Sequence, residues 1–298
     1  MELASPITIY WDLPDVVSDD VELEDVCGAI AECRPLMLQL CVGDCVGGTS
    51  ALHAVQFFEN TSVAVSLTVP MEFTRLPGMA IIVALRIKEL LMQCASLQSL
   101  KQCVGEISAL VGGVQQGTTI GVSVTVGRDN WRDLPAMVSH CRQSGINRLV
   151  LPMQRLCAGE ASFHITAAEQ AELATALAAA GGVKGLNLTI HDPFLWRAFH
   201  PETPFPQAGC QAANTMIYVA ANGNVYPCPT LPLLLGNVRE SRLKTIIASP
   251  EKKTLRRQLL QAPAGCADCG EVAACRGGCR GRGLVLHGSL DGIDTACQ

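Results

Sequence analysis

Seven cysteines in the C-terminal third of the chain are spaced in a way that favours metal binding. They are Cys210, Cys228, Cys266, Cys269, Cys275, Cys279 and Cys297. Four of them form the pattern Cys266-x2-Cys269-x5-Cys275-x3-Cys279, whose Cys-x2-Cys pair can present two thiolates to one metal centre. Iron–sulfur clusters are held by four thiolates, and zinc sites also use Cys-x2-Cys pairs. Because there is one such pair and seven patterned thiols rather than four, iron–sulfur chemistry is favoured over zinc.

The residues between these cysteines suit a negatively charged cluster. Glycines permit a close approach of the backbone, and arginines can offset the charge; they are Gly277, Gly278 and Gly281, and Arg276, Arg280 and Arg282. The segment from Gly265 to Arg282 is dominated by Gly, Cys, Ala and Arg and has no apolar core of its own. A bound metal centre would supply the folding energy that this segment lacks.

Composition narrows the class of protein. The chain has 298 residues, a net charge of -5 and 16% charged residues, so nothing overall favours nucleic-acid binding. Its first residues show no basic region followed by an apolar core, and its apolar runs are shorter than the roughly 20 residues that span a bilayer. Fifteen cysteines without an export signal indicate a reducing compartment, so we expect a cytoplasmic protein without membrane insertion or a disulfide scaffold.

Short apolar runs alternate with amphipathic segments over the first two thirds of the chain. Strands are expected at 7–11, 35–41, 62–69, 87–94, 118–126, 148–151 and 186–190. Helices are expected at 21–33, 50–58, 78–86, 97–110, from a cap at Asp129 or Asn130 to about Ser144, and at 166–180. This order predicts six βα units and a parallel sheet, closed either as a doubly wound sheet or as a full or partial barrel. No Gly-x-Gly-x-x-Gly follows a strand, so a dinucleotide site has little support.

A proline-rich stretch at 201–206 suits a linker, and the pattern changes after it. Asn222-Gly223 predicts a hairpin between 216–220 and 225–226, because the turn needs positive φ. Short helices are expected at 243–247 and 252–260. The basic residues of the second helix, Lys252, Lys253, Arg256 and Arg257, are expected on a solvent-exposed face.

All seven cysteines, together with Gly223, match the signature of the SPASM domain, which the chain resembles over residues 205–298. The resemblance implies two auxiliary 4Fe–4S clusters. Cys266, Cys269, Cys275 and Cys297 would ligate one cluster, and Cys210, Cys228 and Cys279 the other. Family members often have a further cysteine shortly before the position of Cys210, but residues 201–209 contain none. The second cluster is therefore expected to be open or completed by another ligand, for which His200 is a weak candidate.

Residues 118–153 resemble the second half of a radical S-adenosylmethionine barrel. The resemblance implies an α/β fold, with a partial (β/α)6 barrel over residues 1–200 and a small SPASM domain over 201–298. The family's Cys-x3-Cys-x2-Cys motif would follow the first strand, but residues 12–20 hold four aspartates and no cysteine there. Carboxylates do not replace thiolates as ligands of this cluster. The chain is thus identified as a degenerate member, and no S-adenosylmethionine is expected to bind.

Two interpretations of the remaining thiols stay open. Cys33, Cys41 and Cys45 could form a non-standard triad for a catalytic cluster, although only Cys45 is clearly expected in a loop. The alternative is that they are buried or incidental thiols, as expected for Cys27, Cys94, Cys103, Cys141 and Cys157. His191-Asp192, at a strand end, is expected to make loop contacts.

The sequence supports three functions. The first is a non-catalytic accessory protein that docks on, or passes electrons to, a radical S-adenosylmethionine/SPASM enzyme and its precursor peptide. This pattern resembles the SPASM-only companion of GeoRSP-type peptide-modification systems. The second is an active radical enzyme that uses the Cys33, Cys41 and Cys45 triad. The third is a zinc or iron–sulfur scaffold. The cysteine-free loop at 12–20 favours the first, so catalytic residues are not assigned.

Overall fold

The computed structural model describes residues 3–14, 20–43, 49–205 and 209–297. Its first part is built from seven strands, each followed by a helix. The strands are β1 Thr8–Asp12, β2 Met37–Cys41, β3 Ala64–Val69, β4 Glu89–Cys94, β5 Thr119–Val124, β6 Arg148–Leu151 and β7 Asn187–Ile190. The helices are α1 Asp20–Glu32, α2 Thr49–Glu59, α3 Pro77–Ile82, α4 Leu97–Leu110, α5 Leu134–Gln143, α6 Ala167–Ala179 and α7 Pro193–Phe199. Each predicted strand is confirmed within a few residues. The helix expected at 78–86 is shorter and is preceded by a 3-10 helix, Met71–Arg75.

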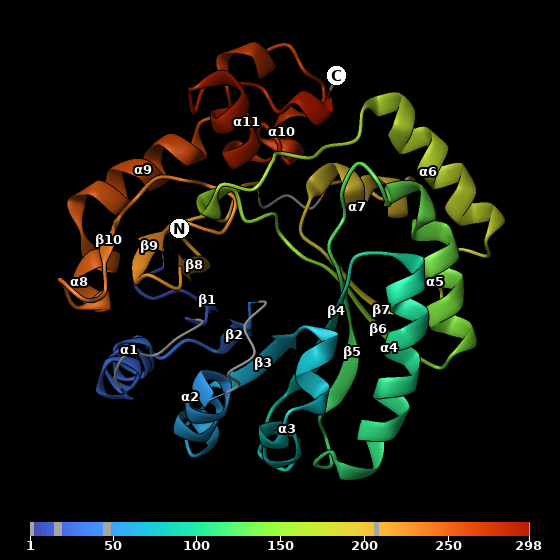
Figure 1. The fold of residues 1–298 in the computed structure, drawn as a ribbon. Helices are drawn as coiled ribbons and strands as arrows, with labels where there is room; N and C mark the ends of the chain where they lie inside the picture. The colour runs from blue at the N-terminus through green and yellow to red at the C-terminus, as the bar shows by residue number, and fades with distance from the viewer. Residues whose placement is uncertain (1–2, 15–19, 44–48, 206–208, 298) are drawn as a thin grey trace.

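The seven strands pair side by side in chain order, and all of these pairs are parallel. Figure 1 shows α1 to α6 along the outer side of the curved sheet, as in a partial barrel. A doubly wound sheet would carry helices on both faces. Of the two closures that the sequence left open, the structure has the partial barrel.

Side chains of the strands alternate between the helices and the barrel interior, as the period of a β-strand requires. In β1, Ile9 and Trp11 pack in the apolar core under the helices, whereas Tyr10 faces an interior cavity. In β2, Leu40 packs in the same core and Gln39 faces the cavity. The apolar core therefore lies between the sheet and the helices, and polar side chains such as Gln39 line the interior of the barrel.

A local signal explains the start of one helix, and a predicted cap of another helix is wrong. The side chain of Thr166 accepts a hydrogen bond from the backbone N–H of Glu169, and Glu169 bonds back, so a capping box starts α6. By contrast, neither Asp129 nor Asn130 caps α5, which begins after Asp133. The Asn130 side chain instead accepts from the N–H of Gly127 and donates to the carbonyl groups of Thr125, in the same loop, and of Ala95, in the loop after β4.

The C-terminal part continues the same sheet. It contains β8 Met216–Val219, β9 Asn224–Tyr226, β10 Gly236–Asn237, α8 Leu243–Ala248, α9 Pro250–Leu260, α10 Val272–Cys275 and α11 Arg280–His287. β8 pairs in parallel with β1, and β9 and β10 follow in antiparallel order. Gly223 has φ +83° in the predicted turn between β8 and β9. Because pairing crosses the expected boundary at residue 200, the division into 1–200 and 201–298 stays a prediction. None of the helices in the described ranges is long and apolar enough to cross a membrane.

Candidate metal centres

Cys210, Cys228 and Cys279, here called the three-thiol site, line one cavity of about 230 Å³. They come from the loop before β8, the loop after β9 and the residue that caps α11. A close approach of the backbone brings them together. A Cβ on Gly281 would lie 2.1 Å from the carbonyl oxygen of Thr230, so only glycine lets the start of α11 pack against that loop.

The thiols of this site are buried, and burial raises the pKa of each of them, that of Cys279 to about 12. Nearby guanidinium groups act in the opposite direction: Arg256 and Arg280 lower the pKa of Cys210, and Arg282 lowers that of Cys279. Three thiolates in this cavity would be disfavoured twice, because burial desolvates each of them and because their like charges repel one another. A bound metal centre is the kind of cation that deprotonates such thiols.

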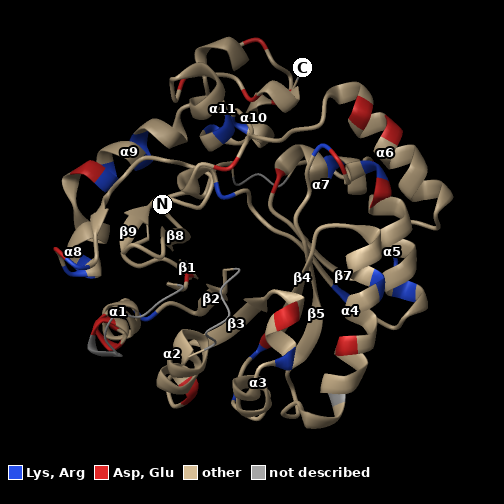
Figure 2. Ribbon diagram, viewed as in Figure 1, with Lys and Arg blue, Asp and Glu red and all other residues tan. Residues whose placement is uncertain are grey.

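The inner face of α9 carries part of this positive charge. Arg256 donates from Nη1 to the carbonyl oxygen of Cys210 at 2.5 Å and to that of Ala212 at 3.3 Å. Lys252 and Arg256 are only 2% and 3% exposed, so the prediction of a fully solvent-exposed basic face is wrong for these two residues. They lie four positions apart on one helical face with Leu255 and Leu259, which is the buried face. Figure 2 shows basic residues on both α9 and α11, the helices beside the site.

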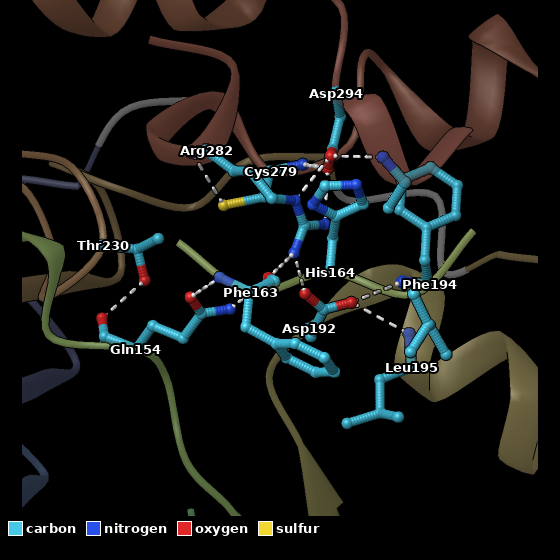
Figure 3. Close-up of polar contacts among 12 residues, drawn as sticks. Gln154, Phe163, His164, Asp192, Phe194, Leu195, Thr230, Cys279, Arg282 and Asp294 are labelled. Atoms are coloured by element: carbon cyan, nitrogen blue, oxygen red, sulfur yellow. Dashed lines mark hydrogen bonds and ion pairs between the residues drawn. The ribbon is translucent and has the colours of Figure 1, made fainter. Parts of the chain in front are cut away.

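Two of the three arginines predicted to offset cluster charge, Arg280 and Arg282, differ in their contacts. Arg282 is paired with two carboxylates: its Nε lies 2.6 Å from Oδ1 of Asp294, and its Nη1 contacts Asp192 (Figure 3). Its charge is therefore largely balanced within the protein. Arg280 donates to the carbonyl groups of Gln261 and Leu290 and lines the cavity. Arg280 thus fits the predicted electrostatic role better than Arg282.

Asp192 has two structural roles beside the site. Its Oδ1 accepts from the N–H groups of Phe194 and Leu195 at 2.9 and 2.8 Å, which caps α7, and its Oδ2 contacts Arg282. The expectation of loop contacts is confirmed for Asp192. Because α7 belongs to the barrel and α11 to the C-terminal part, this carboxylate joins the two.

Cys266, Cys269, Cys275 and Cys297, here called the four-thiol site, gather elsewhere in the C-terminal part. Three of them, Cys269, Cys275 and Cys297, line a second cavity of about 440 Å³, beside α6 and α7. The fourth is 8% exposed, and its carbonyl accepts from the N–H of Cys269 at 3.1 Å. The pKa of Cys297 is raised by burial and then by the charges of Cys269 and Cys266, so these thiols lie near one another.

No three His, Cys, Asp or Glu side chains in the described ranges are close enough to hold a single metal ion. The thiols surround cavities instead of converging on one point. A 4Fe–4S cluster spreads its thiolates around four irons, whereas one zinc ion requires all ligands at about 2.3 Å. The donor set and its arrangement therefore fit a cluster better than a zinc ion.

A third cavity, of about 150 Å³, lies inside the barrel at the carboxyl ends of the strands. Its wall includes Arg155, whose Nε lies 3.0 Å from Oδ2 of Asp12, the last residue of β1. The hydroxyl of Tyr218, on the neighbouring β8, donates to the same carboxylate at 2.6 Å. Sequence reasoning missed this group. The signal available was that carboxyl ends of parallel strands share one edge of a sheet.

The non-standard triad does not assemble in the described residues. Cys33 follows α1 and donates to the carbonyl of Ala29, whereas Cys41 ends β2 and lines the barrel cavity. The two cysteines thus lie at opposite ends of β2, a strand of 5 residues. Because a strand rises about 3.3 Å per residue, its length separates them. Cys45 lies outside the described residues.

The other thiols and His200 also have definite places. Cys27, Cys94, Cys103 and Cys141 are at most 2% exposed, as predicted for core thiols. Cys157 is only partly buried, and its thiol donates to the carbonyl of Cys228 at 3.2 Å. His200 packs against Trp196, with ring centroids 5.0 Å apart, and does not line the three-thiol cavity.

Known proteins match this chain in sequence and in fold. Residues 210–270 match the model of SPASM, an iron–sulfur cluster-binding domain. Mycofactocin maturase MftC of Mycolicibacterium smegmatis is 28% identical over 177 residues, which cover 57% of this chain and 36% of MftC. An AdoMet-dependent heme synthase of Oleidesulfovibrio alaskensis is 33% identical over 89 residues, 30% of this chain and 23% of the synthase. The matched part thus spans about a third of MftC and less than a quarter of the synthase.

Solved structures share the fold over nearly the whole chain. Streptococcus suis SuiB bound to precursor peptide SuiA has a TM-score of 0.74 at 14% identity, covering 100% of this chain and 77% of SuiB. Native anSMEcpe with bound AdoMet and Cp18Cys peptide has a TM-score of 0.65 at 11% identity, covering 98% of this chain and 94% of anSMEcpe. The chain therefore matches an iron–sulfur cluster-binding domain over residues 210–270 and shares the fold of SuiB and anSMEcpe.

Proposed function

We propose that this protein holds two 4Fe–4S clusters and serves as an accessory protein of a peptide-modifying radical S-adenosylmethionine system. One cluster would be held by Cys266, Cys269, Cys275 and Cys297, and the other by the three-thiol site. The observation that carries the proposal is the separation of six of the seven patterned cysteines into two groups that line two cavities, in a part of the chain whose residues 210–270 match an iron–sulfur cluster-binding domain. Electron transfer would be the chemistry that bound clusters supply.

An accessory role is favoured over catalysis by the carboxyl edge of the barrel. Asp12 ends β1, at the point where a catalytic triad of cysteines would follow, and it is engaged by Arg155 and Tyr218. Cys41 is the one cysteine among the described residues that line the barrel cavity. A single thiolate does not hold a 4Fe–4S cluster, so S-adenosylmethionine cleavage has no assembled ligand set in these residues.

The fold supports a proposal for the partners of the protein. SuiB, which shares it, was solved with a precursor peptide. A protein that keeps this barrel and its auxiliary thiols is suited to dock on a radical S-adenosylmethionine/SPASM enzyme, on its precursor peptide, or on both. Docking would take place in the cytoplasm, where thiols stay reduced.

Anaerobic reconstitution tests the proposal. We expect about eight irons and eight sulfides per chain. We also expect no 5′-deoxyadenosine when the protein alone is incubated with S-adenosylmethionine and dithionite. Formation of 5′-deoxyadenosine would favour the active enzyme instead. Stoichiometric zinc without absorbance in the visible range would favour a structural scaffold.

A further inference from the structure

The three-thiol cavity and the barrel cavity share a wall. Pro152, Met153 and His191 line both of them. His191 follows β7 directly, and among the described residues that line the three-thiol cavity it is the one histidine. An imidazole therefore borders the same space as Cys210, Cys228 and Cys279.

The position of His191 is fixed from several sides. Its backbone N–H donates to the carbonyl of Leu151 at 3.3 Å, which continues the pairing of β6 and β7. Its ring stands edge-on to that of Tyr10, with centroids 6.0 Å apart at an angle of 82°. The next residue, Asp192, is held by the start of α7 and by Arg282.

The ring nitrogens of His191 have no hydrogen bond or ion pair to another residue in the part of the chain that the structure describes. Histidines on a cavity wall ordinarily use at least one ring nitrogen as a donor or acceptor. A ligand in the three-thiol cavity could be bound by such a ring nitrogen of His191. The same space borders three thiols that lack a fourth cysteine in the expected position.

Imidazole is an established type of ligand for iron in iron–sulfur clusters, where it replaces thiolate and raises the reduction potential. We propose that the imidazole of His191 is the fourth ligand of the cluster in the three-thiol site. This inference rests on the cluster assignment proposed above. It would close that cluster with a residue of the barrel and leave no iron open for an external ligand.

Other side chains near the site fit this role less well. The thiol of Cys157 is directed at the backbone carbonyl of Cys228 and does not line the cavity. His164 lies beside Arg282 and Asp294 (Figure 3), also away from the cavity wall. His200 packs at the end of α7.

A measurement on the unaltered protein gives the first test. The chain is produced with ¹⁵N-labelled histidine, reconstituted anaerobically, reduced, and studied by pulsed electron paramagnetic resonance. We expect a strongly coupled histidine nitrogen on one of the two clusters, identified by its change from ¹⁴N to ¹⁵N. Full iron content without such a coupling would overturn the inference while leaving the two-cluster proposal intact. Absence of iron would overturn both.

Variants give the second test. His191→Ala should lower iron content from about eight to about seven per chain and produce a 3Fe–4S signal on mild oxidation, because one iron loses its protein ligand. His191→Cys should restore the iron and lower the midpoint potential of that cluster relative to the unaltered protein. The matched control is His53→Ala on the outer helix α2, where the ring faces Glu24 at 3.6 Å.

The same variants identify the rival ligand. If Cys157→Ser produces the 3Fe–4S signal and His191→Ala does not, the fourth ligand is Cys157 and the inference is wrong. If neither variant changes the iron content or the spectrum, both residues are excluded as ligands. Circular dichroism of each variant separates loss of a ligand from loss of the fold.

Discussion

Arg282 and Asp294 form a two-bond ion pair in which each side chain is 1% exposed. Nε of Arg282 lies 2.6 Å from Oδ1, and Nη2 lies 2.8 Å from Oδ2 of the carboxylate. Asp294 also accepts from the backbone N–H of Cys279 at 2.6 Å and from that of Ala296 at 3.1 Å. The pair therefore fixes Cys279 of the three-thiol site and the chain next to Cys297 of the four-thiol site relative to each other.

Replacing Arg282 by methionine should strongly destabilise the protein. The substitution leaves the carboxylate of Asp294 buried without its partner, and removing one member of a buried pair costs about 3–5 kcal/mol. Chemical denaturation of the reconstituted protein under anaerobic conditions measures the loss.

The control for Arg282→Met is Arg132→Met on the surface. Arg132 and Glu172 form an ion pair whose side chains are 61% and 50% exposed. Such a pair contributes at most about 1 kcal/mol. Equal losses in the two variants would show that the buried pair does not hold the C-terminal part together.

Much of this fold could be predicted because its signals are local. Strands such as 118–126 are β-branched, and the capping box at Thr166 lies within four residues of sequence. The division of the cysteines into two ligand sets is what the resemblance to the SPASM signature implies, and it stays a prediction. Contacts between distant segments could not be predicted in this way. The contact between Asp192 and Arg282 joins residues 90 positions apart, and only the packing of α7 against α11 brings them together.

The same limit explains the errors. The basic residues of α9 are predicted to lie on a solvent-exposed face because charged side chains favour exposure. Arg256 instead donates a hydrogen bond to the carbonyl of Cys210, 46 positions away. Asn130 was a plausible cap by residue type, but its side chain is used by the Ala95 carbonyl of another βα loop. In both cases tertiary hydrogen bonds decided against the local preference.

Serine substitutions should distinguish the hypothesis of an accessory protein from the hypothesis of an active radical enzyme. Cys228→Ser removes a thiol of the three-thiol site and should lower iron content from about eight toward about four per chain. Cys41→Ser should leave it unchanged, because Cys41 stands without Cys33 in the barrel cavity. Iron analysis together with visible absorbance measures both. A loss of about four irons in Cys41→Ser would require a third cluster and would revive the triad.

The carboxyl end of β1 offers a third prediction. Asp12→Asn weakens the bonds from Arg155 and Tyr218 to one carboxylate, and hydrogen bonds to a charged group contribute about 1.5–3 kcal/mol. Tyr218→Phe removes a single bond and should cost less. Denaturation gives the free energy of unfolding of each variant. Iron content should stay the same in both, since neither residue lines a thiol site; a parallel loss of iron would tie Asp12 to metal binding.

Removal of the metal should loosen the C-terminal segment and spare the barrel. Residues 265–282 have few apolar side chains, so a bound cluster is expected to provide much of their folding energy. Limited trypsin digestion of the iron-free protein should therefore cut at Arg276 sooner than in the reconstituted protein. Cleavage at Arg142, whose guanidinium binds the carbonyl of Gly181 at the barrel surface, should keep its rate.

The single-site variants show which cluster carries this effect. Cys269→Ser opens the four-thiol site, which lies on the same segment as Arg276, whereas Cys228→Ser opens the other. Faster cleavage at Arg276 in Cys269→Ser alone would assign the stabilisation to the four-thiol site, because the metal would order the chain that supplies its ligands. Equal cleavage rates with and without iron would mean that the buried pair of Arg282 and Asp294 suffices to fold the segment, and the clusters would then serve electron transfer without a structural role.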